Sequence, residues 1–385
     1  MTTADVIVIG GGLHGASAAL HLARAGMRVV VLEKDHVGRH ASGVNAGGVR
    51  RLGRHLAEVP LAVASLALWQ RIEELVDDRC GFERTGQIKV AENEAELATL
   101  RARVAKLEAL GFHHEELIGA AELKALLPAL APHCVGAIIC RDDGAALPFR
   151  TTLAFKRSAE RLGVRFFEGT RAQSLDRVDG VWQVATGDGR FEAPAVVNAA
   201  GAWAGPIAAG LGEPVPMVAT GLMLAITAPV APFVTPVVGA TGRPLSFKQY
   251  ANGTVMIGGG QRGRAELDTN RTVLDYEKLA FNARTAIELF PRMRGAEIVR
   301  AWAGIEGMMA DDIPVIGPSG TSEGVWHAFG FSAHGFQLGP IVGAIVADLV
   351  TTGATSLPIE AFWIGRFRPV EGRPGRPPPT PADGA

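Results

Sequence analysis

Apolar residues in the first thirty positions form two short runs, separated by a glycine turn and an amphipathic segment. Residues 6–9 and 28–32 are the apolar runs, and residues 15–24 have helical periodicity that Gly26 closes. Short apolar runs bounded by turn residues are typical of buried strands, and Gly commonly follows the last turn of a helix. The pattern predicts a strand–helix–strand unit.

The same periodicities recur along the chain. Helical spacing indicates helices over residues 61–76, 97–107 behind a cap at Asn93 and Glu96, 152–162, and 340–350 before Gly353. Apolar segments indicate strands over residues 164–168, 181–186, 222–226, 244–250, 254–259 and 325–329. Asn252 and Gly253 form a strong hairpin signal between two of these strands. We therefore expect an antiparallel sheet between residues 215 and 303.

One long segment lacks charge. Residues 214–242 contain no charged side chain, a length that could cross a bilayer as a helix. It is interrupted by four prolines, at positions 216, 229, 232 and 236. Its apolar residues suit strands and stand at positions 215, 218, 222, 224 and 226. We favour a buried sheet, with a membrane or partner contact as the alternative.

Composition excludes several classes of protein. The 38 basic and 39 acidic residues leave a net charge of −1, without the basic excess that nucleic-acid binding needs. Cys80, Cys134 and Cys140 form neither a metal motif nor a disulfide framework, so we expect no metal site and a cytoplasmic protein. No signal-peptide pattern precedes residue 6, and we expect the mature chain to begin at Met1.

The glycine turn carries the first chemical signal. Gly10, Gly12 and Gly15 satisfy the GxGxxG pattern between a predicted strand and a predicted helix, where backbone can approach a pyrophosphate. Glu33 ends the second strand, 23 positions after Gly10, where a carboxylate can accept hydrogen bonds from a ribose. These features predict dinucleotide binding but do not choose between NAD and FAD.

Three further motifs resemble the FAD-dependent D-amino acid oxidase family. They are the strand and turn over residues 196–203, the Gly-rich turn over residues 330–336, and the loop over residues 41–48. The resemblance runs from Asp5 to about Arg366 and is closest to sarcosine, glycine and D-amino acid oxidoreductases, including dehydrogenase subunits for proline-like and opine substrates. It implies that backbone amides and a helix N-terminus lie near the flavin ring, where positive dipole stabilises the reduced flavin.

The resemblance implies an α/β fold in which a Rossmann-type FAD-binding domain is interleaved with a substrate domain of mixed or antiparallel sheet. We expect the FAD-binding domain over residues 1–80, 145–213 and 303–367, the substrate domain over 81–144 and 214–302, and a disordered tail over 368–385. The expected FAD contacts are Gly10, Gly12, Leu13, His14, Gly15, Glu33, Lys34, Ser42, Asn45, Ala46, Gly47, Ala172, Ala200, Gly201, Trp203, Gly304, Gly330, Ser332, His334, Gly335, Phe336 and Gln337.

The candidate substrate residues depart from the family. Relatives often hold the substrate carboxylate with an arginine where Glu306 stands, and sarcosine oxidases use a lysine where Gln337 stands. Either another basic residue grips a carboxylate, namely Arg50, Arg51 or Lys248, or an amine faces Glu306 with its cationic end. Glu306 could instead be an ion-paired surface residue, Lys248 could face solvent, and His334 could orient substrate or flavin, or bind local backbone.

Further departures concern oxygen and the flavin bond. Met256 occupies the position of a lysine that promotes oxygen reaction in sarcosine oxidases, which predicts slow oxygen use and reoxidation by an electron acceptor or partner subunit. The cysteine that tethers flavin in those enzymes is absent near Gly304. His40 lies where related dehydrogenases attach flavin, so we expect non-covalent FAD with a His40 link as the alternative.

The whole pattern predicts oxidation of the C–N bond of an amino acid or secondary amine to an imine. Positioning of the substrate should matter more than acid or base catalysis, because hydride transfer from a neutral amine needs little proton transfer by protein side chains. Two alternatives stay open: a flavin dehydrogenase of 2-hydroxy acids or polyol phosphates, and a non-catalytic flavin subunit of a larger complex.

Overall fold

The strand–helix–strand unit predicted at the N-terminus is present in the computed structural model, which describes residues 2–368. It consists of β2 (Val6–Ile9), α1 (Leu13–Arg24) and β3 (Val29–Leu32), and the two strands pair in parallel. Every residue of both strands is buried, which is why they are continuous runs of Val, Ile and Leu.

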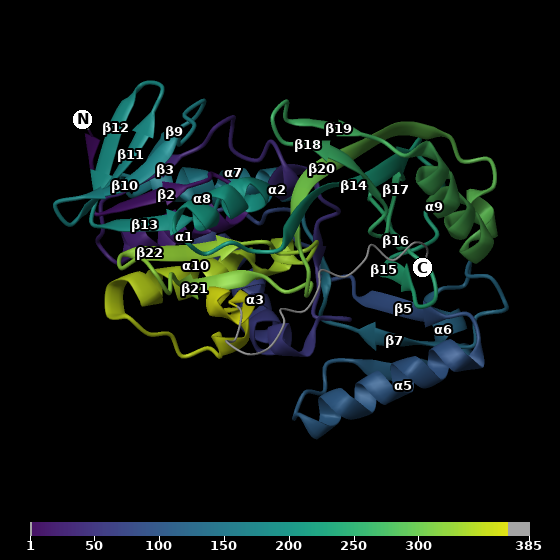
Figure 1. The fold of residues 1–385 in the computed structure, drawn as a ribbon. Coiled ribbons are helices and arrows are strands. Elements are labelled where there is room, and N and C mark those ends of the chain that lie inside the picture. Colours follow the sequence, from purple (N-terminus) through teal and green to yellow (C-terminus); the bar gives the residue numbers. More distant parts are fainter. Residues whose placement is uncertain (1, 369–385) are drawn as a thin grey trace.

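These strands lie side by side in a six-stranded sheet with the order β21-β22-β13-β2-β3-β9 (Figure 1). Only β21 runs antiparallel to its neighbour. The remaining strands are β9 (Arg165–Phe167), β13 (Ala195–Asn198), β21 (Val315–Pro318) and β22 (Val325–Phe329). The parallel arrangement brings the carboxyl ends of β2, β3, β13 and β22 to one edge, where nucleotide sites form in this architecture.

Different layers cover the two faces of this sheet. Val6, Val8 and Val31 pack into the core shared with the helices α1, α3 (Val59–Gln70), α7 (Pro148–Arg161) and α10 (Gly335–Thr352). Ile7 and Val30 point the other way, toward a four-stranded sheet of β1 (Thr2–Thr3), β12 (Gly189–Ala193), β11 (Val181–Thr186) and β10 (Ser174–Val178).

A ten-stranded sheet forms the second unit (Figure 1). Its order is β19-β18-β14-β17-β16-β15-β5-β7-β6, and β20 pairs along β14. All pairs are antiparallel except β15 with β5. The strands are β5 (Gln87–Ala91), β6 (Glu116–Gly119), β7 (Gly136–Cys140), β14 (Met217–Thr227), β15 (Val237–Ala240), β16 (Ser246–Gln249), β17 (Val255–Gly258), β18 (Arg262–Glu266), β19 (Arg271–Val273) and β20 (Ile298–Met309).

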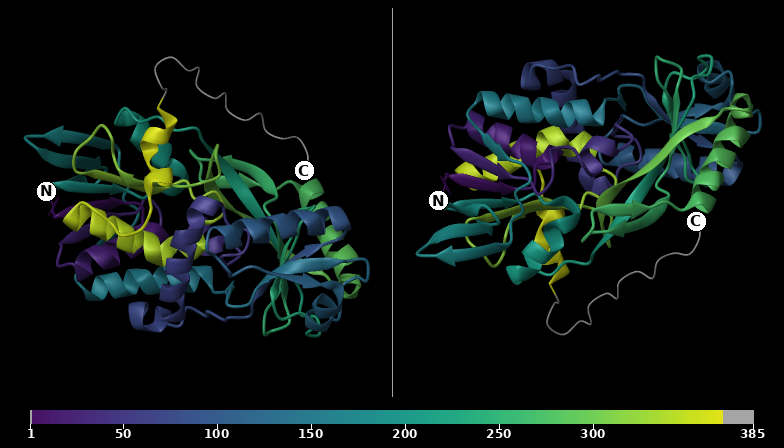
Figure 2. Two further views of the ribbon diagram at one scale, coloured as in Figure 1. Left: turned by 90° about the horizontal axis from the view of Figure 1, so that it is seen from below. Right: turned by 90° about the horizontal axis from the view of Figure 1, so that it is seen from above.

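Helices cover both faces of this sheet at its outer end, as Figure 2 shows from above and below. One core includes residues of α9 (Tyr276–Leu289) and α6 (Ala120–Leu126), and another includes residues of α5 (Glu94–Ala109). Smaller elements connect the units: α2 (Ala41–Val44), α4 (Ile72–Val76), α8 (Ala204–Gly210), β4 (Gly48–Val49) paired with β8 (Gly144–Ala145), and the 3-10 turns Leu56–Glu58, Gly201–Trp203, Pro291–Met293, Glu360–Phe362 and Ile364–Phe367.

Several local predictions are confirmed. The Asn93 side chain accepts a hydrogen bond from the Glu96 N–H at 3.0 Å and caps α5. Gly253 has a φ of +87° in the turn between β16 and β17, as the hairpin signal requires. The uncharged segment forms β14 and β15 rather than a helix, because its prolines fall outside both strands.

Two predicted helix boundaries are wrong. The segment 61–76 is not one helix, because Arg71 leaves helical geometry at a φ of −116° and separates α3 from α4. The last helix begins at Gly335 rather than at Pro340. Pro340 would weaken the first turn of α10. Ser65 and Trp69 of α3 both donate hydrogen bonds to the Gln337 carbonyl, and these contacts from another helix stabilise the turn.

α10 is the one helix among residues 2–368 that is long and apolar enough to span a membrane, but 67% of its most apolar window is buried inside the fold. It packs against α1 and α3 as a core helix. Of the tail predicted over residues 368–385, all but Arg368 lies outside the described residues.

Candidate active site

A cavity of about 1300 Å³ lies between the two units. It begins at the glycine turn after β2 and reaches β5, β14 and β15 of the ten-stranded sheet. The predicted cofactor residues line this cavity, with the exception of Gly15 and Gln337, and so do Arg50, Glu306 and His334. The fold therefore gathers residues that are more than 300 positions apart along one continuous surface.

The glycine turn is shaped by close backbone contacts. Gly10 has a φ of +108°, and a Cβ there would overlap the carbonyl of Ala199, which directly follows the neighbouring strand β13. A Cβ on Gly15 would overlap the carbonyl of Gly10, so Gly15 serves the packing of α1 on β2 and does not face the cavity. Bare backbone and the N-terminus of α1 thus face the space where an anion would lie.

Glu33 lies beside this turn as predicted from its spacing. Its carboxylate accepts hydrogen bonds from the Gly11 N–H at 2.8 Å and from the Asp35 N–H at 2.9 Å. Burial raises the pKa of Glu33, although the two N–H groups oppose this effect. The carboxylate is therefore held in a fixed orientation at the end of β3.

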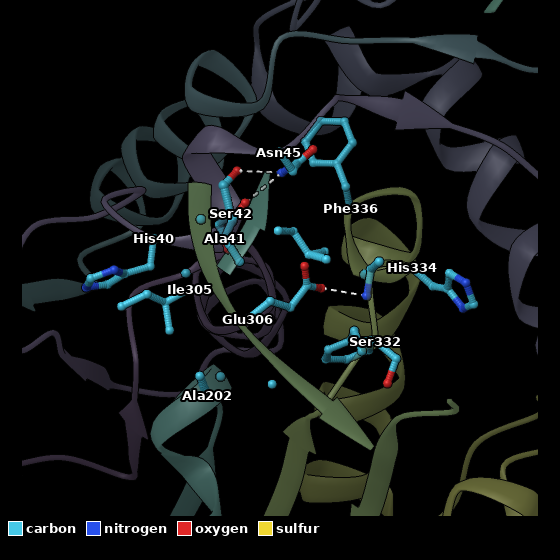
Figure 3. Close-up of a pocket in the computed structure, with 18 of the residues that line it drawn as sticks. His40, Ala41, Ser42, Asn45, Ala202, Ile305, Glu306, Ser332, His334 and Phe336 are labelled. Carbon is cyan, nitrogen blue, oxygen red and sulfur yellow. Dashed lines mark hydrogen bonds between the residues drawn. The ribbon is translucent and has the colours of Figure 1, made fainter. Parts of the chain in front are cut away.

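The α2 loop forms a second wall. Ser42 accepts a hydrogen bond from the Leu13 N–H at 2.9 Å, which joins this loop to α1. The Asn45 side chain donates to the Ala41 carbonyl at 2.8 Å and accepts from the Gly47 N–H at 2.7 Å, as Figure 3 shows in part. Loop backbone is thereby fixed without any cation on the loop itself.

The turn before α10 adopts a strained backbone. Ser332 and Ala333 have φ values of 48° and 68°, in the region that favours glycine. The Ser332 hydroxyl accepts a hydrogen bond from the Met309 N–H at 2.9 Å, and the Ala333 N–H donates to the Glu306 carboxylate at 2.7 Å. Strained residues held by such contacts are typical of ligand sites.

Basic side chains form another part of the cavity wall, which we define as the basic wall of Arg50, Arg54 and Lys89. Arg54 is 1% exposed, and its Nη1 has no hydrogen-bond partner among the described residues. Burial, followed by the charge of Arg50, lowers the pKa of Arg54 to about 9. Burial also lowers the pKa of Arg50 and of Lys89. Three cations facing one cavity favour an anionic ligand.

Buried Asp143 fixes the backbone that follows Arg50 and does not itself line the cavity. Asp143 accepts hydrogen bonds from the backbone N–H groups of Arg51 and Leu52 at 2.7 and 2.9 Å, and it pairs with the Arg51 side chain at 3.1 Å. Arg51 is therefore turned away to Asp143, while Arg50 faces the cavity. Of the alternatives predicted from the sequence, the structure brings Arg50 to the site.

His334 contacts a glutamate that sequence reasoning missed. Its Nδ1 lies 3.1 Å from Glu58 Oε2, and Glu58 is fully buried. Burial by itself raises the pKa of Glu58, but His334, Arg54 and Arg50 outweigh it and hold that pKa below its ordinary value. Burial also lowers the pKa of His334. We infer an ionised Glu58 that orients a neutral His334.

Gln337 and Lys248 do not line the cavity. The Gln337 side chain donates to the Ala62 carbonyl at 2.8 Å, because α10 begins early enough to turn this residue toward α3. Lys248 lies on β16 opposite Met256, 6% exposed, with its ammonium 4.7 Å from the centre of the Tyr250 ring. Neither placement supports the predicted contact with substrate.

Lys248 leads to a stability prediction. Its ammonium has no hydrogen-bond partner among the described residues, and burial lowers its pKa from 10.5 to about 8. The unfolded chain then binds more protons between these two pH values, so the free energy of unfolding rises with pH across that window. At pH 7 the buried charge costs roughly 3 kcal/mol, partly offset by the Tyr250 ring.

We expect Lys248→Met to raise the free energy of unfolding by about 1–3 kcal/mol at pH 7. The gain should shrink as the pH approaches 10.5, where the ordinary lysine also loses its proton. Urea denaturation of both proteins at several pH values measures this difference. A variant that is less stable at pH 7, or a gain that does not change with pH, would contradict the prediction.

Distant segments meet at another part of the cavity. The Lys34 ammonium donates to the Asn270 side chain at 2.6 Å and lies 3.8 Å from the centre of the Trp203 ring. The Trp203 indole N–H donates to the Leu267 carbonyl at 3.2 Å. This Lys34–Asn270 contact joins the end of β3 to the hairpin of β18 and β19.

The residues present fit an FAD molecule. The lining of the cavity passes from the glycine turn and Glu33 to the Ser332 turn. Gly12 and Gly304 leave bare backbone where a Cβ would press against Ser42 and Val44. His14 stacks on Phe331 at 3.6 Å, and its buried Nε2 has no partner among the described residues. An elongated ligand with an anionic centre would use these features.

Comparisons with known proteins agree with this site. A family model described as FAD dependent oxidoreductase (DAO) matches residues 5–349. Glycine oxidase of Bacillus licheniformis is 28% identical, with 94% of this chain and 96% of that protein aligned. One of the opine oxidase subunits of Rhizobium meliloti is 26% identical over 95% of this chain and 98% of that protein.

A solved structure shows the same fold. The crystal structure of L-proline dehydrogenase from P. horikoshii superposes with a TM-score of 0.88 at 28% sequence identity, covering 95% of this chain and 98% of that one. The similarity thus extends over both units of the fold.

Proposed function

This chain belongs to the FAD dependent oxidoreductase (DAO) family, and from that premise we propose that it oxidises the C–N bond of an amino acid whose carboxylate binds the basic wall. The observation that carries the proposal is Arg54, a buried guanidinium in the cavity wall with an unpartnered nitrogen among residues 2–368. A carboxylate there would satisfy a donor that is otherwise costly to bury. The similarity to a glycine oxidase and an L-proline dehydrogenase supports the same substrate class.

The cofactor is FAD. We propose that the glycine turn and the N-terminus of α1 hold its pyrophosphate, that Glu33 binds its ribose, and that the turn at Ser332 lies near its ring. FAD supplies the acceptor for the substrate hydride. The chain itself binds the carboxylate through Arg50 and Arg54, orients the substrate, and limits water in the buried part of the cavity.

The division of labour between the units follows from this assignment. We propose that residues 1–80, 145–213 and 303–367 bind FAD, and that residues 81–144 and 214–302 complete the substrate side. Arg50 and Arg54 come from the first of these segments, so the FAD-binding unit also supplies part of the substrate site. An electron acceptor or partner subunit would reoxidise the flavin, which fits the similarity to an opine oxidase component. The three cysteines are free and buried, which fits the cytoplasm.

Anaerobic bleaching of the flavin tests the proposal. The holoenzyme would be mixed with glycine, proline, D-amino acids, N-methyl amino acids, opine-like secondary amines, simple amines and 2-hydroxy acids, while visible absorbance is followed. We expect reduction by one or more amino acids and little by amines without a carboxylate. Reduction by hydroxy acids alone would replace the proposal with a flavin dehydrogenase of another class, and no reduction would indicate a non-catalytic subunit. Oxygen uptake by the same mixtures prepared in air would test the slow reoxidation predicted from Met256.

His40 bears on the flavin linkage. Its Nε2 lies 2.8 Å from the Asp35 carboxylate, and its ring centre lies 4.6 Å from that of Trp203. Because this nitrogen already has a partner, we expect FAD to be non-covalent. Acid precipitation should release all of the flavin into the supernatant, and a yellow pellet would identify a covalent link.

A further inference from the structure

Glu306 has one carboxylate oxygen with no hydrogen-bond partner among residues 2–368, and we propose that this oxygen accepts the proton of the substrate's ammonium group. The inference deepens the proposed amino acid oxidation and rests on it. The sequence pattern predicts only that Glu306 changes the charge of the substrate-binding site relative to the family. The inference gives Glu306 a catalytic role.

The geometry places this carboxylate in the cavity wall. Glu306 lies near the end of the long strand β20, opposite Thr220 of β14. One of its oxygens accepts the Ala333 N–H at 2.7 Å, which fixes the side chain. In Figure 3 the carboxylate extends into the space between the α2 loop and the Ser332 turn, and the His334 ring points away from it. The second oxygen is therefore available to a ligand.

The elements packed against β20 do not neutralise the carboxylate. β20 packs against β14, β19, α2 and the 3-10 turn Gly201–Trp203. Of these, only β19 carries charged residues, and Arg271 there is exposed. Arg262 on β18 is exposed as well and lowers the Glu306 pKa only in part. His334 is engaged by Glu58.

Burial raises the pKa of Glu306 to about 7, against the opposing effects of the Ala333 N–H and of Arg262. A base with a pKa near the working pH is suited to proton transfer. A carboxylate at its ordinary pKa would be a much weaker proton acceptor for an ammonium group.

The chemistry requires such a transfer. An amino acid arrives as an ammonium ion, whose nitrogen has no free electron pair. When the N–H bond breaks, its proton goes to the free Glu306 oxygen and its electron pair stays on nitrogen. That pair would form the C=N bond as the α-carbon loses its hydride, for which bound FAD would be the acceptor, and the product would be a protonated imine. The basic wall holds the carboxylate end while Glu306 receives the proton from the nitrogen end.

Glu306→Gln tests this role, because an amide oxygen can still accept the Ala333 N–H while the side chain cannot take a proton. Stopped-flow reduction of the holoenzyme would be measured between pH 5 and 9 with two substrates of different amine pKa. For the natural chain, we expect reduction rate over Kd to fall about tenfold per pH unit below about pH 7, with an inflection common to both substrates. Glu306→Gln should lose this inflection and react roughly 100-fold or more slowly. Glu306→Asp should restore part of the rate.

Glu323→Gln serves as the matched control, because the Glu323 side chain is 86% exposed on another surface. An unchanged rate and inflection in Glu306→Gln would overturn the inference, and so would a weaker Kd with an unchanged limiting rate and pH profile. Both outcomes leave amino acid oxidation itself intact. Failure of every amine to reduce the natural holoenzyme would instead overturn the proposed function.

Discussion

Replacing Arg54 with methionine is expected to lower kcat/KM for an amino acid by roughly 30- to 1,000-fold, corresponding to about 2–4 kcal/mol. The loss follows because methionine keeps much of the side-chain volume but removes the buried guanidinium that we assign to the substrate carboxylate. Steady-state or stopped-flow flavin reduction measures it. The effect should fall mainly on apparent affinity, since the carboxylate is bound both before and during hydride transfer.

Two comparisons make this test specific. A simple amine without a carboxylate should react with the Arg54→Met protein about as it does with the natural chain. Arg79→Met removes an arginine whose side chain is 79% exposed, and it should change neither activity. Equal losses for the amine and the amino acid would show that Arg54 acts on the fold or the flavin rather than on the carboxylate.

Gly12→Val is expected to weaken FAD binding by roughly 30- to 1,000-fold, or about 2–4 kcal/mol. A Cβ at Gly12 would lie 2.8 Å from the Ser42 hydroxyl, and the branched side chain would extend farther into the cavity. Moving Ser42 would also break its hydrogen bond to the Leu13 N–H. The purified variant should lack visible flavin absorbance and regain it only at high FAD concentration.

Gly119→Val is the control for this substitution. Gly119 precedes α6 in extended backbone, and a Cβ there meets no atom within 4 Å. This variant should keep its flavin. If Gly12→Val bound FAD as tightly as the natural chain, the assignment of the glycine turn to the pyrophosphate would be wrong.

The parts of the site that sequence reasoning predicted are the parts that depend on local pattern. Gly10, Gly12 and Glu33 occupy fixed positions in a strand–helix–strand unit, so their spacing alone places them at the edge of the sheet. Glu306 could be singled out because its charge departs from a family pattern. Each of these residues lines the cavity.

Other residues depend on how distant segments pack. Local analysis of the sequence does not single out Arg54 or Glu58, since a charged residue outside a long helix or strand is usually solvated. The one signal in the sequence is the spacing of four residues from Arg50 to Arg54 and from Arg54 to Glu58, which indicates that these three side chains share a face. Gln337 could not be placed without knowing that α10 begins at Gly335 and turns it toward α3.

The strand β20 was not predicted, although it carries Glu306. Gly304 and Gly307 interrupt the alternation of apolar and polar residues along β20. Glycine is needed at both positions because a Cβ there would clash with Val44 and Met217, respectively. The residues that make the strand fit its neighbours therefore weaken its sequence signal.

The Lys34–Asn270 contact has a consequence for biosynthesis. Its two partners are separated by 236 positions, and the cavity lining continues to Phe336. While the ribosome is still translating the central part of the chain, the nascent protein holds the glycine turn but neither Asn270 nor the Ser332 turn. The FAD site that we propose is complete only after Phe336 has left the exit tunnel. We therefore expect FAD to bind at full affinity only after Asn270 and the Ser332 turn have both been synthesised.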